Sequence, residues 1–349
     1  MKKNKLRILQ VIDTLNIGGG EVVFSDLCTI LFESKMDVTA MFLLNAGHLK
    51  DKLPKGMPTF ELKRENKWSI AKMRQCSNIL KEFDIIHCHF RHVYRYLQLV
   101  NVIFHLKRKI IFHDHYGSID IDKKAPKFFT TILKPKYYIG VSTSLTSWAI
   151  NILKIKKQNV FLLENIIIKK NNYQPYQKGK FDLILVSNIK PIKNNFFAVE
   201  LMDFLDKRLL LVGENHNNEY FQKIINKSNY NLKFSIDTEI SSVQEILPNF
   251  KLGLHTSKSE SGPLVLIEYI CQGLPFLAYQ TGEVALTLKK YFPQYFIDNF
   301  DMKSWISKIE FLLTEEPDLE KMKYVFDKYY GRNQYLEKVK TIYQCIRNY

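Results

Sequence analysis

Short apolar runs rich in β-branched and aromatic residues recur along this chain and alternate with segments of helical periodicity, such as residues 22–33 and 70–83. Strands that are apolar throughout are typical of parallel sheets covered by helices on both faces. The runs form two series and predict strands at 6–12, 38–44, 84–89, 109–113, 137–142 and 160–163, and at 181–187, 208–212, 231–235, 252–255, 275–279 and 294–297. Two series of this kind predict an α/β protein with two doubly wound, Rossmann-like domains.

A polar stretch that contains proline and glycine, residues 169–180, separates the two series and is typical of a linker. A chain of 349 residues suffices for two cores, so we expect an N-terminal domain over residues 1–168 and a C-terminal domain over residues 181–330. The amphipathic end, residues 331–349, predicts a terminal helix that can pack back on the N-terminal domain. Because ligands of open α/β sheets bind beyond the carboxyl ends of the strands, we expect the site in the cleft between the domains.

Nearly all of the net charge of +16 lies in the first half of the chain. Residues 1–170 hold 29 Lys and Arg against 14 Asp and Glu, whereas residues 171–349 hold 22 against 21. One interpretation is that the excess serves only solubility, and the other is a face that docks on an anionic membrane or lipid phosphate. A nucleic-acid partner is not expected, because no known nucleic-acid-binding module accompanies the charge.

Cysteine usage and hydropathy indicate the compartment. The five cysteines are odd in number and scattered, without Cys-x-x-Cys spacing, which favours reduced core residues over disulfides or a zinc site. No apolar run approaches the roughly 18–20 residues of a spanning helix, and residues 6–12 run directly into Asp13, so neither a span nor a secretory signal is expected. We therefore expect a cytoplasmic protein, either free or peripheral at the inner face of the cell membrane.

The most informative segment, residues 257–275, contains Glu260 and Glu268, eight positions apart. It predicts a Gly-Pro loop that contains Glu260, after a buried strand, and then a helix from Leu264 that contains Glu268. A helix start preceded by glycine offers unpaired backbone N–H groups to a phosphate. Two carboxylates beside such an anion site suit the hydroxyl groups of sugars on either side of it. This combination points to a ligand built from a sugar, a diphosphate and a nucleoside.

A glycine-rich turn, Gly18 to Gly20, follows the first predicted strand and precedes a helix. Glycine lets the backbone approach a ligand closely, and the helix N-terminus would face an anion. The spacing is not Gly-x-Gly-x-x-Gly, so a nicotinamide cofactor is not expected. A purely structural tight turn is the alternative.

Two histidine clusters end predicted strands, His87 with His89 and His113 with His115. Polar residues at strand ends of an α/β sheet fall at the edge of the site. A His-x-His pair can ligate a metal ion, but the sequence places no third ligand, so no metal site is expected. We expect His87 to hydrogen-bond the backbone and His115 to contact the substrate, with His113 as the alternative.

Lys193 lies in a loop between a predicted strand and a predicted helix, where its ammonium would face a phosphate. Beside a leaving diphosphate, an ammonium stabilises the charge that develops as the bond breaks. The alternative is one exposed loop lysine among 51 basic residues.

Residues 257–275 resemble the Glu-x7-Glu signature, with its trailing Gly-x-Pro, of the retaining glycosyltransferases of family 4, which have the two-domain GT-B fold. The resemblance spans nearly the whole chain, and the Glu-x7-Glu segment is its specific part. Further positions agree in order along the chain: Gly18 and Gly19 with Glu21, Asp84 to His89, His115, Val141 and Ser142, Asn165, Pro191 with Lys193 and Asn194, and Val212 with Gly213.

The resemblance implies a role for each matching residue. Glu260 would contact the donor sugar near its reacting face, His115 would help orient attack, and Lys193 would hold the diphosphate. Glu268 would bind the ribose hydroxyls of the nucleotide. The implied donor-binding set is Gly18, Gly19, Asn188, Lys193, Ser261, Gly262, Pro263, Leu264 and Glu268, in which Pro263 has no N–H to donate. Members of the family generally work without a bound metal or other cofactor, so none is expected, and the nucleotide sugar is a substrate.

One position departs from the family pattern. The family usually has an arginine five residues before the lysine, and here Asn188 stands at that position. Asparagine can donate a hydrogen bond but carries no charge, so diphosphate binding depends more on Lys193. Lys190 could partly replace the missing arginine.

The implied function is retaining transfer of a sugar from a nucleotide-diphosphate donor to a saccharide or lipid-linked acceptor. The C-terminal domain would bind the donor, and the basic N-terminal domain would bind the acceptor and, in the second interpretation of its charge, an anionic membrane. The implied pathway is bacterial surface polysaccharide biosynthesis (lipopolysaccharide, capsule or a related glycan). The alternatives are a non-hydrolysing nucleotide-sugar epimerase and a catalytically silent GT-B binding partner of another transferase.

Overall fold

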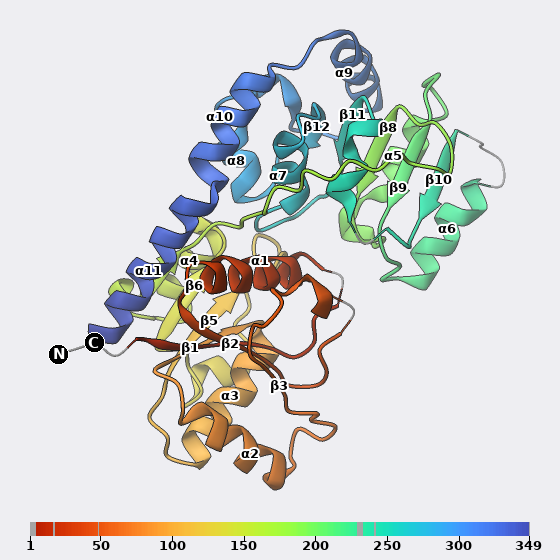
Figure 1. Ribbon diagram of the computed structural model, residues 1–349. Coiled ribbons are helices and arrows are strands. Elements are labelled where there is room, and N and C mark those ends of the chain that lie inside the picture. Colours follow the sequence, from red (N-terminus) through yellow and green to blue (C-terminus); the bar gives the residue numbers. More distant parts are fainter. Residues whose placement is uncertain (1–4, 17, 48, 229–232, 241, 349) are drawn as a thin grey trace. The chain divides into compact units, whose positions relative to one another are not determined.

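The computed structural model describes residues 5–16, 18–47, 49–228, 233–240 and 242–348. The chain divides into two compact units, which we call unit 1 (Met1–Ile166 and Arg332–Tyr349) and unit 2 (Ile167–Gly331). Each unit is built on a parallel sheet flanked by helices (Figure 1). This confirms the predicted α/β class with two doubly wound sheets. No helix formed by the described residues is long and apolar enough to cross a membrane.

The described residues of unit 1 form a seven-stranded sheet in the order β3-β2-β1-β4-β5-β6-β7. Its strands are β1 (Arg7–Ile12), β2 (Asp37–Phe42), β3 (Thr59–Glu61), β4 (Ile85–His89), β5 (Lys109–Asp114), β6 (Tyr137–Gly140) and β7 (Val160–Leu162). Central strands such as β4 are buried along their whole length, as expected for strands covered on both faces. The strand order reverses between β1 and β4, so a crevice for ligands is expected at the carboxyl ends of these two strands.

Helices cover both faces of this sheet. They are α1 (Gly19–Glu33), α2 (Ile70–Leu80), α3 (Arg91–Ile103), α4 (Thr143–Asn151) and α11 (Arg332–Asn348). In Figure 1, α1 lies on one face and α2 and α3 lie together on the other.

The C-terminal helix α11 packs against α1 in unit 1. Its buried residues recur at helical spacing, which makes one apolar stripe: Tyr335, Val339, Ile342, Tyr343 and Ile346. The Lys109 ammonium donates hydrogen bonds to the backbone carbonyls of Ile346 and Arg347, at 2.8 and 2.9 Å. A cation at these carbonyls satisfies acceptors that the end of a helix leaves unpaired.

The described residues of unit 2 form a six-stranded sheet in the order β10-β9-β8-β11-β12-β13. Its strands are β8 (Leu183–Val186), β9 (Leu209–Val212), β10 (Phe234–Asp237), β11 (Leu252–His255), β12 (Phe276–Tyr279) and β13 (Phe296–Ile297). Its helices are α5 (Asn195–Leu201), α6 (Asn218–Ser228), α7 (Leu264–Cys271), α8 (Gly282–Lys289), α9 (Met302–Thr314) and α10 (Leu319–Tyr330). Here the strand order reverses between β8 and β11.

Several elements differ from the sequence prediction. The strand β3 was not predicted, because its three residues are exposed or half-buried and lack an apolar run. The strand predicted at 231–235 is observed as β10, and its residues 231 and 232 lie outside the described residues. Residues 169–180, for which a linker remains the prediction, fall within unit 2, where the Tyr176 hydroxyl donates to Asp237 at 3.1 Å.

Candidate functional site

In unit 2 the candidate site lies where the strand order reverses. The loops that follow β8 and β11 lie side by side, because the N–H of Lys258 donates to the carbonyl of Ile192 at 2.9 Å and the hydroxyl of Thr256 donates to the carbonyl of Lys193 at 3.1 Å. Residues Pro191–Lys193 form one 3-10 turn, and Asn194 then takes a left-handed conformation with φ 54° before α5 begins. Proline at a helix start and asparagine at positive φ are both locally favoured, so this loop has a defined shape.

The central contact of this site is an ion pair between Lys193 Nζ and Glu260 Oε1. Their side chains are 17% and 13% exposed, so the pair is largely removed from water. The buried His255 places Nε2 at 3.5 Å from the same carboxylate oxygen. A carboxylate, an ammonium and an imidazole therefore meet at the carboxyl ends of β8 and β11.

The charges at this site shift the pKa of two groups. Burial opposes ionisation of Glu260, but Lys193 and His255 outweigh it and hold the pKa of that carboxyl well below its usual range. Burial, together with the neighbouring Lys193, lowers the pKa of Lys190. Lys190 thus lies close enough to Lys193 for the charge of Lys193 to lower its pKa. The site therefore has two neighbouring ammonium groups.

The backbone around Glu260 is fixed by residues that follow β12. The N–H of Glu260 donates to the hydroxyl of Thr281 at 3.1 Å, and the N–H of Glu283 donates to the carbonyl of Ser261 at 2.8 Å. Gly282 has φ +80°, and a Cβ there would lie 2.8 Å from Pro263 Cδ and 3.1 Å from the Glu260 carbonyl oxygen. Only glycine allows this close approach, which holds the 260–263 loop against α8.

The helix α7 begins at Leu264, directly after this loop, and Glu268 lies half-buried in its second turn. Helices begin with backbone N–H groups that have no partner within the helix. Tyr269 anchors α7 to the sheet, since its hydroxyl donates to the carbonyl of Leu254 at 3.1 Å. A Cβ at Gly253 would lie 2.6 Å from the Tyr269 ring, so glycine in β11 makes room for this anchor.

The ion pair predicts a pH dependence of stability. Because the folded-state pKa of Glu260 is lowered, its ionisation stabilises the fold above the ordinary pKa of about 4.5 and stops doing so as the pH falls through the folded value. We expect the free energy of unfolding of the wild type to exceed that of Glu260→Gln by a constant amount between pH 6 and 8, and the difference to shrink below about pH 4.5. Urea unfolding of both proteins across pH measures this, and a difference independent of pH would contradict it.

In unit 1 the start of α1 lies beside His115. Gly18 is the N-cap of α1 and Gly19 its first residue. A Cβ at Gly20 would lie 2.5 Å from the Phe90 ring and 3.5 Å from the His115 ring, so glycine lets the helix start approach both rings. Phe90 itself has φ 71°, which is rare for an aromatic residue and is found at functional sites where the surrounding structure imposes it.

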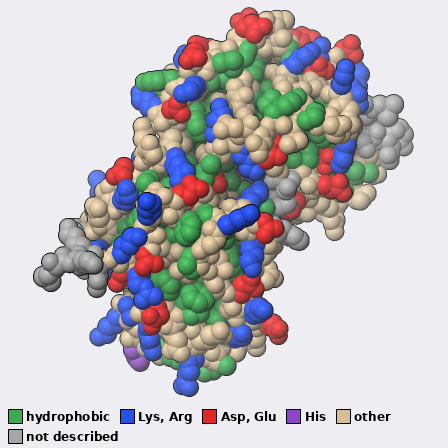
Figure 2. All heavy atoms as spheres, viewed as in Figure 1, with side chains coloured by type: hydrophobic (Ala, Val, Ile, Leu, Met, Phe, Trp, Pro, Cys, Tyr) green, Lys and Arg blue, Asp and Glu red, His purple; other side chains and the backbone are tan. Residues whose placement is uncertain are grey.

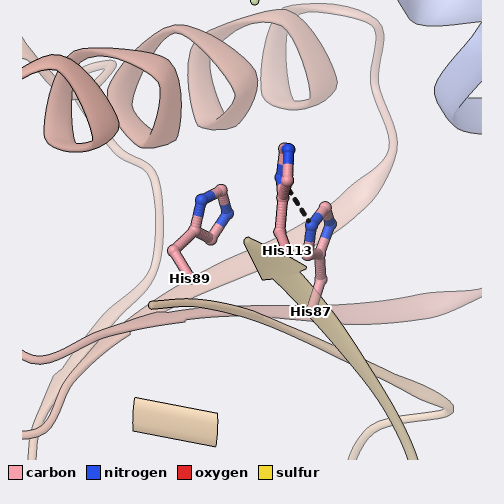
Figure 3. Close-up of side chains that lie close together, drawn as sticks. All are labelled: His87, His89 and His113. Carbon is pink, nitrogen blue, oxygen red and sulfur yellow. Dashed lines mark hydrogen bonds between the residues drawn. The ribbon is translucent and has the colours of Figure 1, made fainter. Parts of the chain in front are cut away.

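Behind His115 lies a cluster of imidazoles at the ends of β4 and β5. His87 Nε2 lies 3.2 Å from His113 Nδ1, and His89 Nδ1 lies 2.9 Å from His115 Nε2. Figure 3 shows the bond between His87 and His113, with His89 beside them. Burial lowers the pKa of His87 and of His115 to about 3, and it also lowers the pKa of His89 and of His113. All four rings are therefore neutral near pH 7.

Among the described residues, His87, His89 and His113 form a group that could hold a metal ion, with ligand atoms within 4.8 Å of one another. The sequence placed no third ligand beside His87 and His89, and the structure supplies His113. However, five of the six ring nitrogens already make hydrogen bonds with other rings, with Gln10 or with Tyr343. A metal ion would have to break several of these bonds.

The structure groups the predicted site residues in two sets. In unit 2 it brings Lys193 to Glu260 and places Ser261, Gly262 and Pro263 between Glu260 and the start of α7 at Leu264. In unit 1 the residue that it brings to the His115 ring is Gly20, which follows Gly18 and Gly19. No described contact joins Asn188 to the ion pair, whereas the pKa of Lys190 responds to it. Residues that the sequence did not single out also belong here: Gln10, Phe90, His255, Thr281, Gly282 and Tyr343.

Residues 167–328 match a family model described as Glycosyl transferases group 1. No curated protein matches the chain. Among solved structures, HepE of Anabaena in complex with UDP and glucose has a TM-score of 0.79 at 12% identity, covering 97% of this chain and 99% of that chain.

Two other solved structures are similar over comparable lengths. WaaB, a lipopolysaccharide outer core galactosyltransferase in its apo form, has a TM-score of 0.66 at 16% identity, with 97% and 99% of the two chains covered. A variant of S. aureus TarM in complex with Fondaparinux, alpha-GlcNAc-glycerol and UDP has a TM-score of 0.75 at 12% identity, with the same coverage. At such identities the likeness establishes the fold, and it confirms the predicted GT-B fold.

Proposed function

We propose that this chain, of which residues 167–328 match the group 1 glycosyl transferases, transfers a sugar with retention from a nucleotide-sugar donor to a saccharide or lipid-linked acceptor. In this proposal unit 2 binds the donor and unit 1 binds the acceptor. The single observation that supports it most directly is the largely buried contact of Lys193 with Glu260, directly before the start of α7.

Each residue of the candidate site in unit 2 has a proposed role that follows from its chemistry. Lys193 and backbone N–H groups at the start of α7 bind the diphosphate, since an ammonium and a helix N-terminus both attract anions. Glu260, ionised and held by Lys193 and His255, accepts hydrogen bonds from hydroxyls of the donor sugar. Glu268 accepts hydrogen bonds from the ribose hydroxyls. When the bond to the sugar breaks, Lys193 stabilises the negative charge that develops on the leaving diphosphate.

Lys190 takes part of the task that an arginine at position 188 would have. Asn188 cannot supply a second positive charge, but the ammonium of Lys190 lies near enough to Lys193 for the two to influence each other. A diphosphate carries more than one negative charge, so two ammonium groups suit it better than one.

In unit 1 we propose that His115 contacts the donor sugar and that Gly18 and Gly19 bring backbone N–H groups close to the ligand. HepE binds UDP, glucose and UDP-glucose, and TarM binds UDP, according to their complexes. UDP sugars are therefore the first donors to test.

A release assay tests the transferase proposal. The protein is incubated with a panel of UDP and GDP sugars, with and without a membrane extract as the source of acceptor. Nucleotide release that depends on the extract supports transfer. Conversion of the donor sugar without an acceptor would identify an epimerase instead, and no change in any donor would indicate a silent binding protein.

Removal of divalent metals should leave this activity unchanged. The proposed charge stabilisation comes from Lys193 and Lys190, and the imidazoles of the unit 1 cluster are already paired with one another. We expect the initial rate with excess EDTA to stay within about twofold of the rate without it, because a chelator affects only a protein that depends on bound metal. Loss of activity that Mg²⁺, Mn²⁺ or Zn²⁺ restores would contradict the metal-independent proposal.

The basic excess of unit 1 supports a lipid-linked acceptor at an anionic membrane. Residues 123–163 contain eight lysines and no Asp, Glu or Arg. These 41 residues therefore have a net charge of +8, half of the net charge of +16 of the whole chain. A cavity of about 390 Å³ in this segment is lined by Lys134, Lys136, Lys154 and Lys156 together with uncharged residues. Three isoleucines in or beside the segment are exposed, Ile121 (64%), Ile132 (74%) and Ile152 (49%). Lysines interleaved with exposed apolar side chains suit the interface of an anionic bilayer.

On the face shown in Figure 2, Lys and Arg side chains are spread over the surface with Asp and Glu among them. Charge alone therefore does not single out this face, and the acid-free segment 123–163 is the better candidate for docking. In the proposal the protein acts at the cytoplasmic side of the membrane, where such a segment meets anionic lipid, and the acceptor belongs to a surface polysaccharide.

Flotation with vesicles tests the docking segment. Changing its four cavity lysines to glutamine should weaken binding to phosphatidylglycerol vesicles by up to about 1,000-fold at low salt, since each lysine contributes about 1 kcal/mol near anionic lipid. The matched control changes four exposed lysines of unit 2 and should have a much smaller effect: Lys258, Lys290, Lys303 and Lys321. Equal effects of the two sets would show that only net charge matters, and no binding by the wild type would remove the membrane proposal.

A further inference from the structure

The hydroxyl of Tyr343 on α11 joins the C-terminal helix to the histidine cluster. It accepts a hydrogen bond from Gln10 Nε2 and lies 2.7 Å from His87 Nδ1. Tyr343 and Gln10 are both buried and lie 333 positions apart in the sequence. Gln10 also places its Oε1 at 3.3 Å from His89 Nε2. One amide group therefore contacts both the helix and the imidazoles.

The orientation of the Gln10 amide determines where the proton of His89 lies. Gln10 Oε1 can only accept, so His89 Nε2 must carry the proton of this neutral ring. His89 Nδ1 is then an acceptor, and it lies 2.9 Å from His115 Nε2, which must carry the proton of the His115 ring. His115 Nδ1 is consequently left as an acceptor.

The same amide determines the protons of the other pair of rings. Gln10 Nε2, which can only donate, also lies 3.4 Å from His87 Nδ1, so His87 Nδ1 is an acceptor and the Tyr343 hydroxyl donates its proton to it. His87 Nε2 then carries the ring proton and donates to His113 Nδ1 at 3.2 Å. The proton of His113 lies on Nε2, a buried atom that has no hydrogen-bond partner in the part of the chain that the structure describes. If the amide oxygen and nitrogen of Gln10 exchanged places, the proton of each of the four rings would move to the other ring nitrogen.

We propose that Gln10 and Tyr343 are positioning residues that hold His115 in the tautomer protonated at Nε2, so that Nδ1 accepts a hydrogen bond from a hydroxyl of the donor sugar. The tautomer part depends only on the contacts above, whereas its use in catalysis rests on the proposed function. The opposite tautomer would offer an N–H to the sugar in place of a lone pair. The C-terminal helix then helps, through Tyr343, to determine which nitrogen of His115 carries the proton.

Nitrogen NMR of the imidazoles tests the tautomer directly. In protein labelled with ¹⁵N-histidine, long-range ¹H–¹⁵N spectra distinguish a protonated ring nitrogen from a bare one, and His115→Asn identifies the His115 signals among those of the nine histidines. We expect protonated Nε2 and bare Nδ1 in His115 near pH 7.5. The opposite pattern, or an equal mixture, in the wild type would overturn the proposal whatever the activity of the protein.

Two variants and a matched control separate this role from a general effect on folding. Tyr343→Phe removes the acceptor that orients the amide, and Gln10→Met removes the amide. Both should give a mixture of His115 tautomers and lower kcat about 3- to 10-fold with little change in the donor KM. Tyr335→Phe is the control, since Tyr335 is also buried on α11 but its hydroxyl has no hydrogen-bond partner among the described residues.

The outcomes distinguish the inference from the proposed function. An unchanged His115 tautomer in both Tyr343→Phe and Gln10→Met overturns the positioning role. A changed tautomer with unchanged kcat overturns the use of His115 in catalysis and leaves the transferase proposal to the nucleotide-release assay. Equal loss of kcat in Tyr335→Phe and Tyr343→Phe would show an effect of packing alone and would also overturn the positioning role.

Discussion

Changing Lys193 to methionine should lower kcat about 10²- to 10³-fold while the KM for the donor changes by less than about tenfold. Removing one group that stabilises developing negative charge typically has an effect of this size. The ground-state diphosphate keeps Lys190 and the helix N–H groups, so binding should suffer less than turnover. Steady-state kinetics with a saturating acceptor measure both constants, and a loss that appears only in KM would contradict the assignment.

A double variant separates this loss from damage to the fold. Lys193→Met removes the ammonium that is paired with the largely buried Glu260 carboxylate, and breaking a buried pair in this way commonly costs about 3–5 kcal/mol. Lys193→Met with Glu260→Gln removes both charges and should recover much of the lost stability but none of the activity. Lys251→Ala breaks a surface ion pair with Asp182 in the same unit and is the control. It should change neither kcat nor the KM for the donor. Recovery of kcat in the double variant would mean that Lys193 acts only through the fold.

Changing Glu268 to alanine should weaken donor binding about 100-fold and leave kcat at a saturating donor concentration within about fivefold. Hydrogen bonds to a charged group contribute about 1.5–3 kcal/mol, and a carboxylate shared by two ribose hydroxyls lies at the upper end of that range. Calorimetric titration with UDP measures the effect without any acceptor. The isosteric Glu268→Gln should lie between the wild type and Glu268→Ala, because it keeps one acceptor oxygen but loses the charge.

A carboxylate away from the site controls for the change in net charge. Glu219→Ala removes an exposed glutamate of α6 in the same unit and should bind UDP as the wild type does. If Glu268→Ala and Glu219→Ala weaken binding equally, or if Glu268→Ala lowers kcat alone, then Glu268 does not bind the ribose. A 2′-deoxyribose donor should lose less affinity in Glu268→Ala than in the wild type, which ties the effect to the hydroxyl.

Much of unit 2 could be predicted because its signals are local. The apolar run before Glu260, the glycine and proline of the loop and the helical spacing after Leu264 are all read within about twenty residues, and β11 and α7 are observed where they indicated. Lys193 was recognised by its place after a strand, and its contact with Glu260 across 67 positions agrees with the rule that ligand sites gather at the carboxyl ends of strands. The three-residue strand β3 was missed, since a short, exposed strand has no periodicity to detect.

The contacts that link His115 to the other imidazoles, to Gln10 and to Tyr343 are not indicated by any local sequence pattern. Nothing in the amphipathic pattern of residues 335–347 distinguishes Tyr343 from the other buried residues of α11, and Gln10 occurs within an apolar strand where a single polar residue has no partner in sequence. Local sequence likewise does not indicate a third imidazole beside His87 and His89, because His113 reaches them only through the pairing of β4 with β5.

The order of the elements, the division into two α/β units and the types of residue available for chemistry were determined by the sequence alone. Periodicity, turn residues and strand ends depend on neighbours along the chain, so these features can be read without coordinates. The tertiary structure decided which of those residues meet, and in which protonation state, because the contacts of Tyr343 with Gln10, and of Gln10 with His89, depend on packing between segments far apart in the chain. Hydrogen bonds are set by tenths of an ångström, and only the packed fold determines distances on that scale.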